Sequence, residues 1–223
     1  MPHVAVTEYH LRLTRELRAC EATQLRGFFG RAFSEHKLLH QHGADGKPIY
    51  EYPRVQFKVF QRQAVLIGLG EGSTLLDELW PQVDHVRLQG EELGVREATL
   101  RKRQEPFGES DELVTYRFIT PCLALNETNV RRYRGQESPA ARQQVLDEIV
   151  VGNCLAFAKV LSHRVQDWLT GDCSRLHRVQ DSRVRGMWWQ SFMGLFRVNF
   201  VLPDHVGLGK WVSRGYGTLV REG

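Results

Sequence analysis

RVQFKVFQRQAVLIGLGEGSTLLDELWPQVDHVRL, residues 54–88, carries the pattern of three strands and one helix. Apolar and polar residues alternate over 54–60, which predicts a strand with one apolar and one polar face. Apolar runs at 64–69 and 83–88 predict two further strands, and residues 73–80 between them predict a short helix. We therefore expect the order strand, strand, helix, strand in this stretch.

The segment before this stretch adds one strand and one helix. Residues 4–13 alternate in the manner of a strand, and residues 25–33 place apolar side chains at helical spacing. The complete order β-α-β-β-α-β is that of the ferredoxin-like fold, in which a four-stranded antiparallel sheet carries both helices on one face. We assign residues 1–95 to a first module of this kind.

The remainder of the chain predicts a second module of the same class. Residues 94–111 are rich in charge and contain a proline and a glycine, so we interpret them as a link. A strand is predicted at 113–119, a long helix follows Ser138 as its N-cap, and another strand is predicted at 195–202. We assign residues 110–223 to this module, which gives an α+β chain of tandem RRM-like modules. Sheets of this type are a common RNA-binding platform.

A glycine-rich loop lies near the end of the chain, at residues 207–217 (GLGKWVSRGYG). Two Gly-apolar-Gly triplets are separated by five residues that include Lys210 and Arg214. Glycine permits a positive φ and close approach to a ligand, and successive N–H groups in such a turn form an anion-binding concavity. The residues that we predict to hold a polyanion here are Gly207, Gly209, Lys210, Ser213, Arg214, Gly215 and Gly217.

Two familiar nucleotide-binding motifs do not fit this loop. The dinucleotide fingerprint requires a third glycine where Val212 stands, and the phosphate-binding loop of nucleoside triphosphatases requires Ser or Thr where Trp211 stands. The alternative hypothesis is that the glycines only serve tight turns. The sequence alone leaves both interpretations open.

Composition indicates a globular protein with a mild basic excess. Apolar residues make up 42% and charged residues 25%, which is typical of soluble domains. The net charge of +4 permits nucleic-acid binding without requiring it. The four cysteines form no Cys-x-x-Cys pair, and the first thirteen residues lack the apolar core of a secretory leader. We therefore expect reduced thiols, no membrane segment and a cytoplasmic protein.

The glycine-rich loop, placed before a final short strand, resembles the signature of the CRISPR-associated endoribonucleases that cut repeat RNA into guide RNAs. These Cas6-type proteins belong to the glycine-rich-loop RAMP superfamily. Further segments resemble one branch of this family, namely residues 52–58, 66–69, 152–155 and 199–204. The resemblance spans most of the chain. It implies tandem ferredoxin-like modules and no cofactor. It also implies that the partner is a CRISPR repeat RNA that forms a stem-loop.

Members of this branch carry a His-x-His pair after the first helix, and the matching residues are His40 and His42. Cleavage of RNA without a metal proceeds by attack of a 2′-hydroxyl on the adjacent phosphate and leaves a 2′,3′-cyclic phosphate and a 5′-hydroxyl. One group must accept a proton and another must donate one, and histidine does either near neutral pH. In an extended segment both rings would point to one side. The helix should therefore have ended before this pair.

Two further residues are candidates for the reaction. Lys58, on the polar face of its strand, is our first choice as electrostatic stabiliser of the transition state, and Tyr50 is a candidate orienting hydroxyl. The histidines have alternative interpretations as solvated side chains or, with His36, as a metal site. No His-Glu-x-x-His spacing occurs and no cysteine lies close, so we predict no metal.

Basic segments with neighbouring aromatic residues extend the predicted RNA-binding surface. They comprise Arg131, Arg132, Arg134, Arg175, His177, Arg178, Arg183 and Arg185, with Trp188 and Trp189 close by. We therefore predict a metal-independent endoribonuclease. The alternatives are a non-catalytic RNA-binding subunit of a CRISPR effector complex and a small-molecule nucleotide-binding domain. A homodimer and an effector complex are partners that the sequence leaves open.

Overall fold

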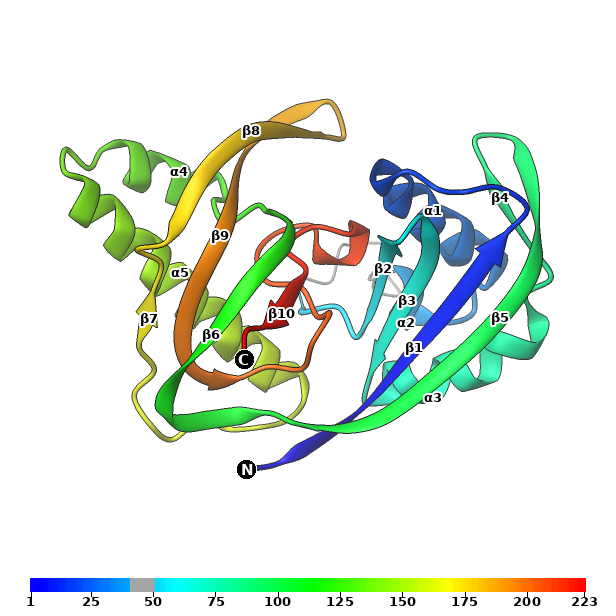
Figure 1. Ribbon diagram of the computed structural model, residues 1–223, viewed down its shortest axis with the longest axis horizontal. Coiled ribbons are helices and arrows are strands. Elements are labelled where there is room, and N and C mark those ends of the chain that lie inside the picture. Colours follow the sequence, from blue (N-terminus) through cyan, green and yellow to red (C-terminus); the bar gives the residue numbers. More distant parts are fainter. Residues whose placement is uncertain (41–50) are drawn as a thin grey trace. The chain divides into compact units, whose positions relative to one another are not determined.

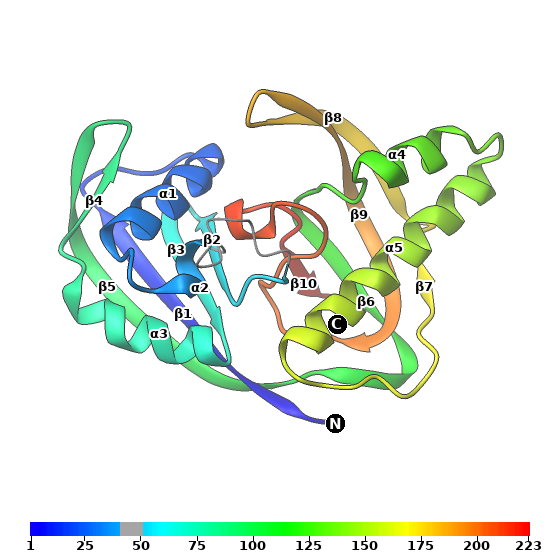
Figure 2. The same ribbon diagram turned by 180° about the vertical axis from the view of Figure 1, so that it is seen from behind.

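The computed structural model describes residues 1–40 and 51–223, without the side chain of His40. The chain forms two compact units (Figures 1 and 2). The N-terminal unit comprises residues 3–105 together with 213–215, and the C-terminal unit comprises residues 1–2, 106–212 and 216–223. Each unit thus includes a short piece from the opposite end of the chain.

The N-terminal unit is a five-stranded sheet with helices on one face (Figures 1 and 2). The strand order is β2-β3-β1-β5-β4, and the pairs β1–β3, β2–β3 and β4–β5 are antiparallel. The strands are β1 (His3–Leu13), β2 (Val55–Phe60), β3 (Gln63–Leu69), β4 (His85–Leu88) and β5 (Glu91–Pro106), and the helical segments are η1 (Ala19–Glu21), α1 (Ala22–Ala32), α2 (Lys37–His40), α3 (Glu71–Leu79) and η2 (Trp80–Gln82). The predicted β-α-β-β-α-β order is confirmed.

The core of this unit lies between the sheet and the helices α1 and α3. Phe29 of α1 is fully buried, and its ring centroid lies 5.6 Å from that of Phe57 on β2. Leu76 of α3 and Leu11 of β1 belong to the same apolar cluster. Burial of this one face is the main driving force that holds the helices on the sheet.

The predicted charged link at residues 94–111 is wrong, because this segment forms most of β5 and the start of the next strand. Apolar side chains of β5, including Leu100, pack against the core. Its charges are paired across elements: Arg103 contacts Glu8 of β1 at 2.6 Å, and Lys102 contacts Asp77 of α3 at 2.8 Å. Partners far away in the sequence make the charged composition compatible with a strand.

The C-terminal unit is a second antiparallel sheet with two helices (Figures 1 and 2). The order is β10-β6-β9-β7, and β8 pairs with β9. The elements are β6 (Gly108–Cys122), α4 (Glu127–Arg134), α5 (Pro139–Val160), β7 (Gly171–Asp172), β8 (Leu176–Val184), β9 (Met187–Val201), η3 (Val212–Arg214) and β10 (Leu219–Arg221). The predicted N-cap of the long helix is confirmed, since the Ser138 hydroxyl accepts a hydrogen bond from the Ala141 N–H.

A buried tyrosine fixes the point at which β9 ends. The Tyr116 hydroxyl accepts a hydrogen bond from the Leu202 N–H at 2.8 Å and donates one to the Phe200 carbonyl at 3.3 Å. Its ring stacks on Phe196, with centroids 5.5 Å apart. The hydroxyl of β6 therefore pins the exit of β9 into the loop that follows.

All four cysteines are free thiols, and only Cys20 is exposed. Within residues 1–40 and 51–223, we find no helix with the length and apolar character needed to span a bilayer.

We expect Tyr116→Phe to lower the free energy of unfolding by about 1–2 kcal/mol, because the buried Leu202 N–H would lose its acceptor. Urea denaturation followed by circular dichroism measures this loss. Tyr133→Phe is the matched control, since the Tyr133 ring packs edge-on against Phe192 at 5.8 Å and is kept by this substitution. Equal stability of the Tyr116→Phe variant and the parent would contradict the role of the hydroxyl.

Candidate functional site

The glycine-rich loop is closed by its own backbone. The Leu208 N–H donates to the Gly217 carbonyl and the Gly217 N–H to the Pro121 carbonyl, both at 2.8 Å. The Lys210 N–H donates to the Leu123 carbonyl at 2.9 Å. These three N–H groups are therefore not the free donors that the sequence predicted for an anion-binding concavity. Contacts to phosphate at these positions would come from side chains.

Close packing explains the glycine at position 217. Its φ is +61°, and a Cβ atom there would lie 1.9 Å from the Leu208 carbonyl oxygen. The tight-turn hypothesis therefore holds at this position. The Lys210 side chain is exposed, Arg214 is half-buried and Ser213 is buried. Lys210 and Arg214 are the side chains that can present positive charge here.

Strands β8 and β9 form a basic hairpin, which lies beside the glycine-rich loop within the C-terminal unit. Trp211 of the loop lies edge-on to Trp189 of β9, with ring centroids 5.9 Å apart. The hairpin turns at Arg185 and Gly186, both with positive φ, as expected for a two-residue hairpin turn. The sequence predicted basic charge in this segment but not the strand β8.

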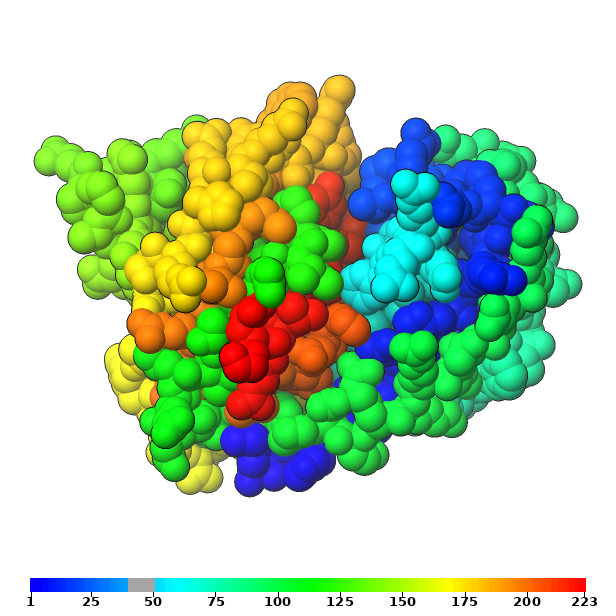
Figure 3. All heavy atoms as spheres, in the orientation of Figure 1, coloured from blue at the N-terminus to red at the C-terminus, as the bar shows by residue number. Residues whose placement is uncertain are grey.

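The tip of this hairpin combines a cation with an aromatic ring. The Arg183 guanidinium lies 5.9 Å from the ring centroid of Trp188, whose side chain is 66% exposed. In the space-filling view the hairpin reaches the molecular surface, in yellow and light orange (Figure 3). An exposed ring with an adjacent cation suits stacking on a nucleobase and contact with its phosphate.

The arginines of α4 divide into two kinds. Arg132 forms an ion pair with Glu148 of α5. Arg131 and Arg134 are exposed and form no ion pair with any residue in the described ranges. These two guanidinium groups can therefore meet a phosphate without first leaving a carboxylate.

The predicted catalytic histidines lie at the edge of the described chain. The first long helix, α1, ends at Ala32, and the short helix α2 ends at His40. His40 is thus the last residue of a helix, and the expectation that helical structure ends before the pair is wrong at this residue. His42 and Tyr50 lie outside the described residues, so the expectation that the two rings point to one side stays a prediction.

Lys58 does not lie on an exposed face of its strand. The side chain of Lys58 is 0% exposed, and so is that of Gln56 on the same face of β2. Gln56 donates hydrogen bonds to the Tyr52 hydroxyl and the Pro53 carbonyl. Gln56 and Lys58 share one face of β2, as the alternation predicted, but this polar face is buried: both faces of β2 are closed from Val55 to Lys58.

Burial lowers the pKa of Lys58 to about 7 from an ordinary value of 10.5, because the charged form loses its hydration. A lysine with this pKa exists in both protonation states near neutral pH. The amine can therefore stabilise negative charge when protonated, or exchange a proton during a reaction.

His10, which the sequence analysis did not predict as a site residue, lies in the same cross-strand row as Lys58. Lys58 on β2 and His10 on β1 both pair in register with Val65 on β3. The His10 ring contacts the Glu8 carboxylate at 2.8 Å, and Glu8 in turn contacts Arg103. The alternation in β1 places Glu8 and His10 on one side, but the register that aligns them with Lys58 cannot be read from the sequence.

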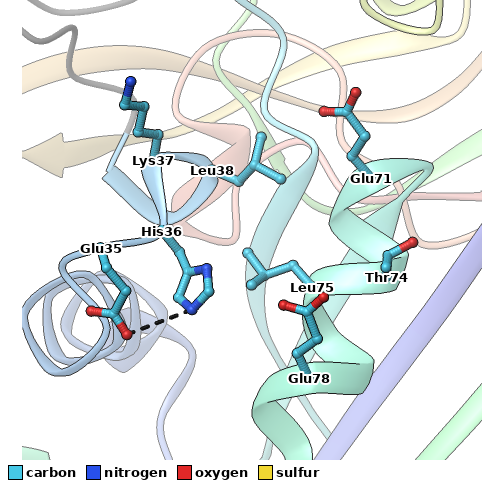
Figure 4. A pocket seen from close by; sticks show the side chains of 8 residues that line it. All are labelled: Glu35, His36, Lys37, Leu38, Glu71, Thr74, Leu75 and Glu78. Atoms are coloured by element: carbon cyan, nitrogen blue, oxygen red, sulfur yellow. Dashed lines mark ion pairs between the residues drawn. The ribbon is translucent and has the colours of Figure 1, made fainter.

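A separate hollow of about 460 Å³ lies in the N-terminal unit (Figure 4). It is lined by Glu35, His36, Lys37, Leu38, Glu71, Thr74, Leu75 and Glu78. Three carboxylates make it unsuitable for a phosphate. The His36 ring lies 3.5 Å from Glu35, but the described residues include no cluster of three or more potential metal ligands.

Residues 3–106 match the family model for the Cas6b N-terminal domain, and residues 108–222 match that for the Cas6b C-terminal domain. This chain belongs to the Cas6b family. An uncharacterized protein from Methanocaldococcus jannaschii is 31% identical to this Cas6b-family chain over 148 residues, which cover 66% of this chain and 98% of that protein.

Solved structures agree with this Cas6b assignment. A crystal structure of Cas6b is 26% identical over 99% of this chain and all of its own, with a TM-score of 0.90. A second, described as the CRISPR RNA processing endoribonuclease Cas6b, has the same identity and coverage and a TM-score of 0.77. A Cas6 product complex, 17% identical with a TM-score of 0.55 over 98% of this chain and all of its own, shares the fold. The Cas6-type resemblance and the tandem ferredoxin-like fold are confirmed.

We expect the stability of this Cas6b-family protein to rise with pH between about 7 and 8; at higher pH the buried thiols of Cys122, Cys154 and Cys173, whose pKa values burial raises, act in the opposite direction. Lys58 has a lowered pKa in the folded state, so the unfolded state binds more protons in this window. The contribution is complete above the unfolded pKa and is lost as the pH falls to about 7. Thermal melting across this range should show the rise in the parent and its loss in Lys58→Met, whereas exposed Lys210→Met should keep it. A parent-like rise in Lys58→Met would contradict the buried-lysine assignment.

Proposed function

We propose that this chain cleaves CRISPR precursor transcripts within each repeat to release guide RNAs. The observation that carries the proposal is the full-length similarity, at 26% identity, to a crystal structure described as a CRISPR RNA processing endoribonuclease. The buried lysine of near-neutral pKa and the exposed basic hairpin support it. We place the activity in the cytoplasm. We further propose that the guide RNA is delivered to an effector complex and that the protein forms a homodimer.

The proposed reaction is metal-independent attack of a 2′-hydroxyl on the adjacent phosphate. One residue of the pair His40 and His42 accepts the proton from the 2′-oxygen, and the other donates a proton to the departing 5′-oxygen. Protonated Lys58 stabilises the charge on the phosphorane-like transition state, and Tyr50 orients the reacting groups. The products are a 2′,3′-cyclic phosphate and a 5′-hydroxyl.

The proposed RNA surface uses side chains more than backbone amides. Lys210 and Arg214 present charge from the glycine-rich loop, and Trp188 presents a stacking surface from the hairpin. Arg131 and Arg134 add two guanidinium groups without carboxylate partners among the described residues. A repeat RNA, as a stem-loop or a single strand, is the polyanion that this set would hold.

Cleavage of labelled repeat RNA in excess chelator tests the reaction. We expect His40→Ala and His42→Ala each to lower the cleavage rate about 100-fold or more, because proton transfer contributes that much in general acid–base catalysis. His36→Ala is the control, since this histidine precedes the pair and contacts Glu35. Gel analysis should show 2′,3′-cyclic ends. RNA that is bound tightly by the parent but stays uncut would instead establish a non-catalytic RNA-binding subunit.

The arginines of α4 give a matched test of RNA binding. We expect Arg131→Gln and Arg134→Gln each to weaken binding and to reduce the slope of log K against log salt by about one, because one phosphate contact is lost. Arg132→Gln should change the slope less, because its guanidinium already pairs with Glu148. Fluorescence anisotropy over a salt series measures these slopes. Unaltered slopes in all three variants would remove α4 from the RNA surface.

A further inference from the structure

The tip of the glycine-rich loop, Ser213–Gly215, belongs to the N-terminal unit. Gly215 has a φ of +92°, and a Cβ atom there would lie 2.9 Å from the Cβ of Ala22 and 3.5 Å from the Phe57 carbonyl oxygen. Real Cβ atoms essentially never approach another heavy atom as closely as 2.9 Å, whereas 3.5 Å is an ordinary van der Waals contact. Only glycine therefore allows this contact without a shift of the backbone.

The two residues that Gly215 approaches lie at the start of α1 and in the outermost strand of the sheet. Ala22 is fully buried at the start of α1, and Phe57 lies in β2, the outermost strand of the sheet order. An outer strand presents backbone groups to water unless another segment covers it. Lys58, the residue after Phe57, is fully buried. The loop tip thus lies against the edge of the strand that carries Lys58.

We propose that Gly215 is a positioning residue: its close contact with Ala22 and Phe57 holds the loop tip against β2 and so keeps Lys58 in its buried place. The inference rests on the proposed role of Lys58 in RNA cleavage. The glycine-rich loop then has a second role besides RNA binding, because its tip holds Lys58, a proposed catalytic residue, in position.

The ionisation of Lys58 supplies a readout that a purely RNA-binding role would not change. Burial holds the pKa of this lysine at about 7. If the loop tip is displaced from β2, water reaches the amine and its pKa rises toward the ordinary value of 10.5. The protonated amine is the form that stabilises the transition state. The alkaline fall in cleavage rate should therefore move to higher pH.

The test compares three full-length variants. Gly215→Ala introduces the clash, and Gly215→Ala combined with Ala22→Gly removes it again. Gly90→Ala is the matched control, because Gly90, between β4 and β5, also has a positive φ of +87° but no atom within 4 Å of its Cβ position. We measure kcat at saturating repeat RNA, the Kd for RNA and the pH dependence of kcat for each variant.

We expect Gly215→Ala to lower kcat at its pH optimum about tenfold or more, as misplaced catalytic groups do. Its alkaline limb should move up by about one pH unit, whether or not the displacement of Arg214 also weakens the Kd. The double variant should recover part of the rate, and Gly90→Ala should resemble the parent. If Gly215→Ala does not fold, Ala22→Val presses on the same contact from the helix side and should give the same changes.

A weakened Kd with unchanged kcat and pH profile would overturn the proposal, and so would parent-like behaviour of Gly215→Ala in all three measurements. If the parent itself cuts no RNA, the proposed function fails. The positioning role of Gly215 is then tested by measuring the Lys58 pKa in an NMR titration of ¹⁵N-lysine-labelled protein. A Lys58 pKa that is equal in the parent and Gly215→Ala would then overturn it. A higher pKa in the variant would support it.

Discussion

Closure of the glycine-rich loop by backbone contacts is the constraint on which the functional arrangement depends. Gly207 forms a β-bridge with Thr218, and the carbonyl of Leu208 fills the space where Gly217 would otherwise carry a side chain. The ten residues between Gly207 and Thr218 therefore form a loop whose two ends lie side by side. This closure lets the tip belong to the N-terminal unit while the flanks continue into β10. Any residue larger than glycine at position 217 would open the base of the loop.

The burial of Lys58 lowers the stability of this chain. A charged amine withdrawn from water costs free energy, and a fold optimised for stability alone would place an apolar residue at position 58. The neighbouring polar groups Gln56 and Glu8 are also almost fully buried on the sheet. Such groups concentrate at sites where chemistry requires a shifted pKa. The sheet thus carries a buried polar row on the face opposite its apolar core.

Features that depend on neighbours in sequence were predictable, and features that depend on distant partners were not. Alternation in residues 54–60 and the cap at Ser138 act locally, so the β-α-β-β-α-β order and the start of α5 are correct. Strand β5 was missed because its charges find partners such as Glu8 and Asp77 only in the folded sheet. The burial of Lys58 and its alignment with His10 depend on strand register, which alternation cannot supply.

The exchange of short end segments between the two units has a consequence for synthesis on the ribosome. Strand β1 begins the N-terminal unit, yet this unit includes Ser213–Gly215, which are translated only after β9. Domains generally fold as units in order of synthesis, with the N-terminal one first. Here the N-terminal sheet can form early, but the edge of β2 receives its loop only after β9 and the loop itself have been translated. The surroundings of β2 are therefore completed only after most of the C-terminal unit has been synthesised, and a chain that stops before residue 213 would lack this contact.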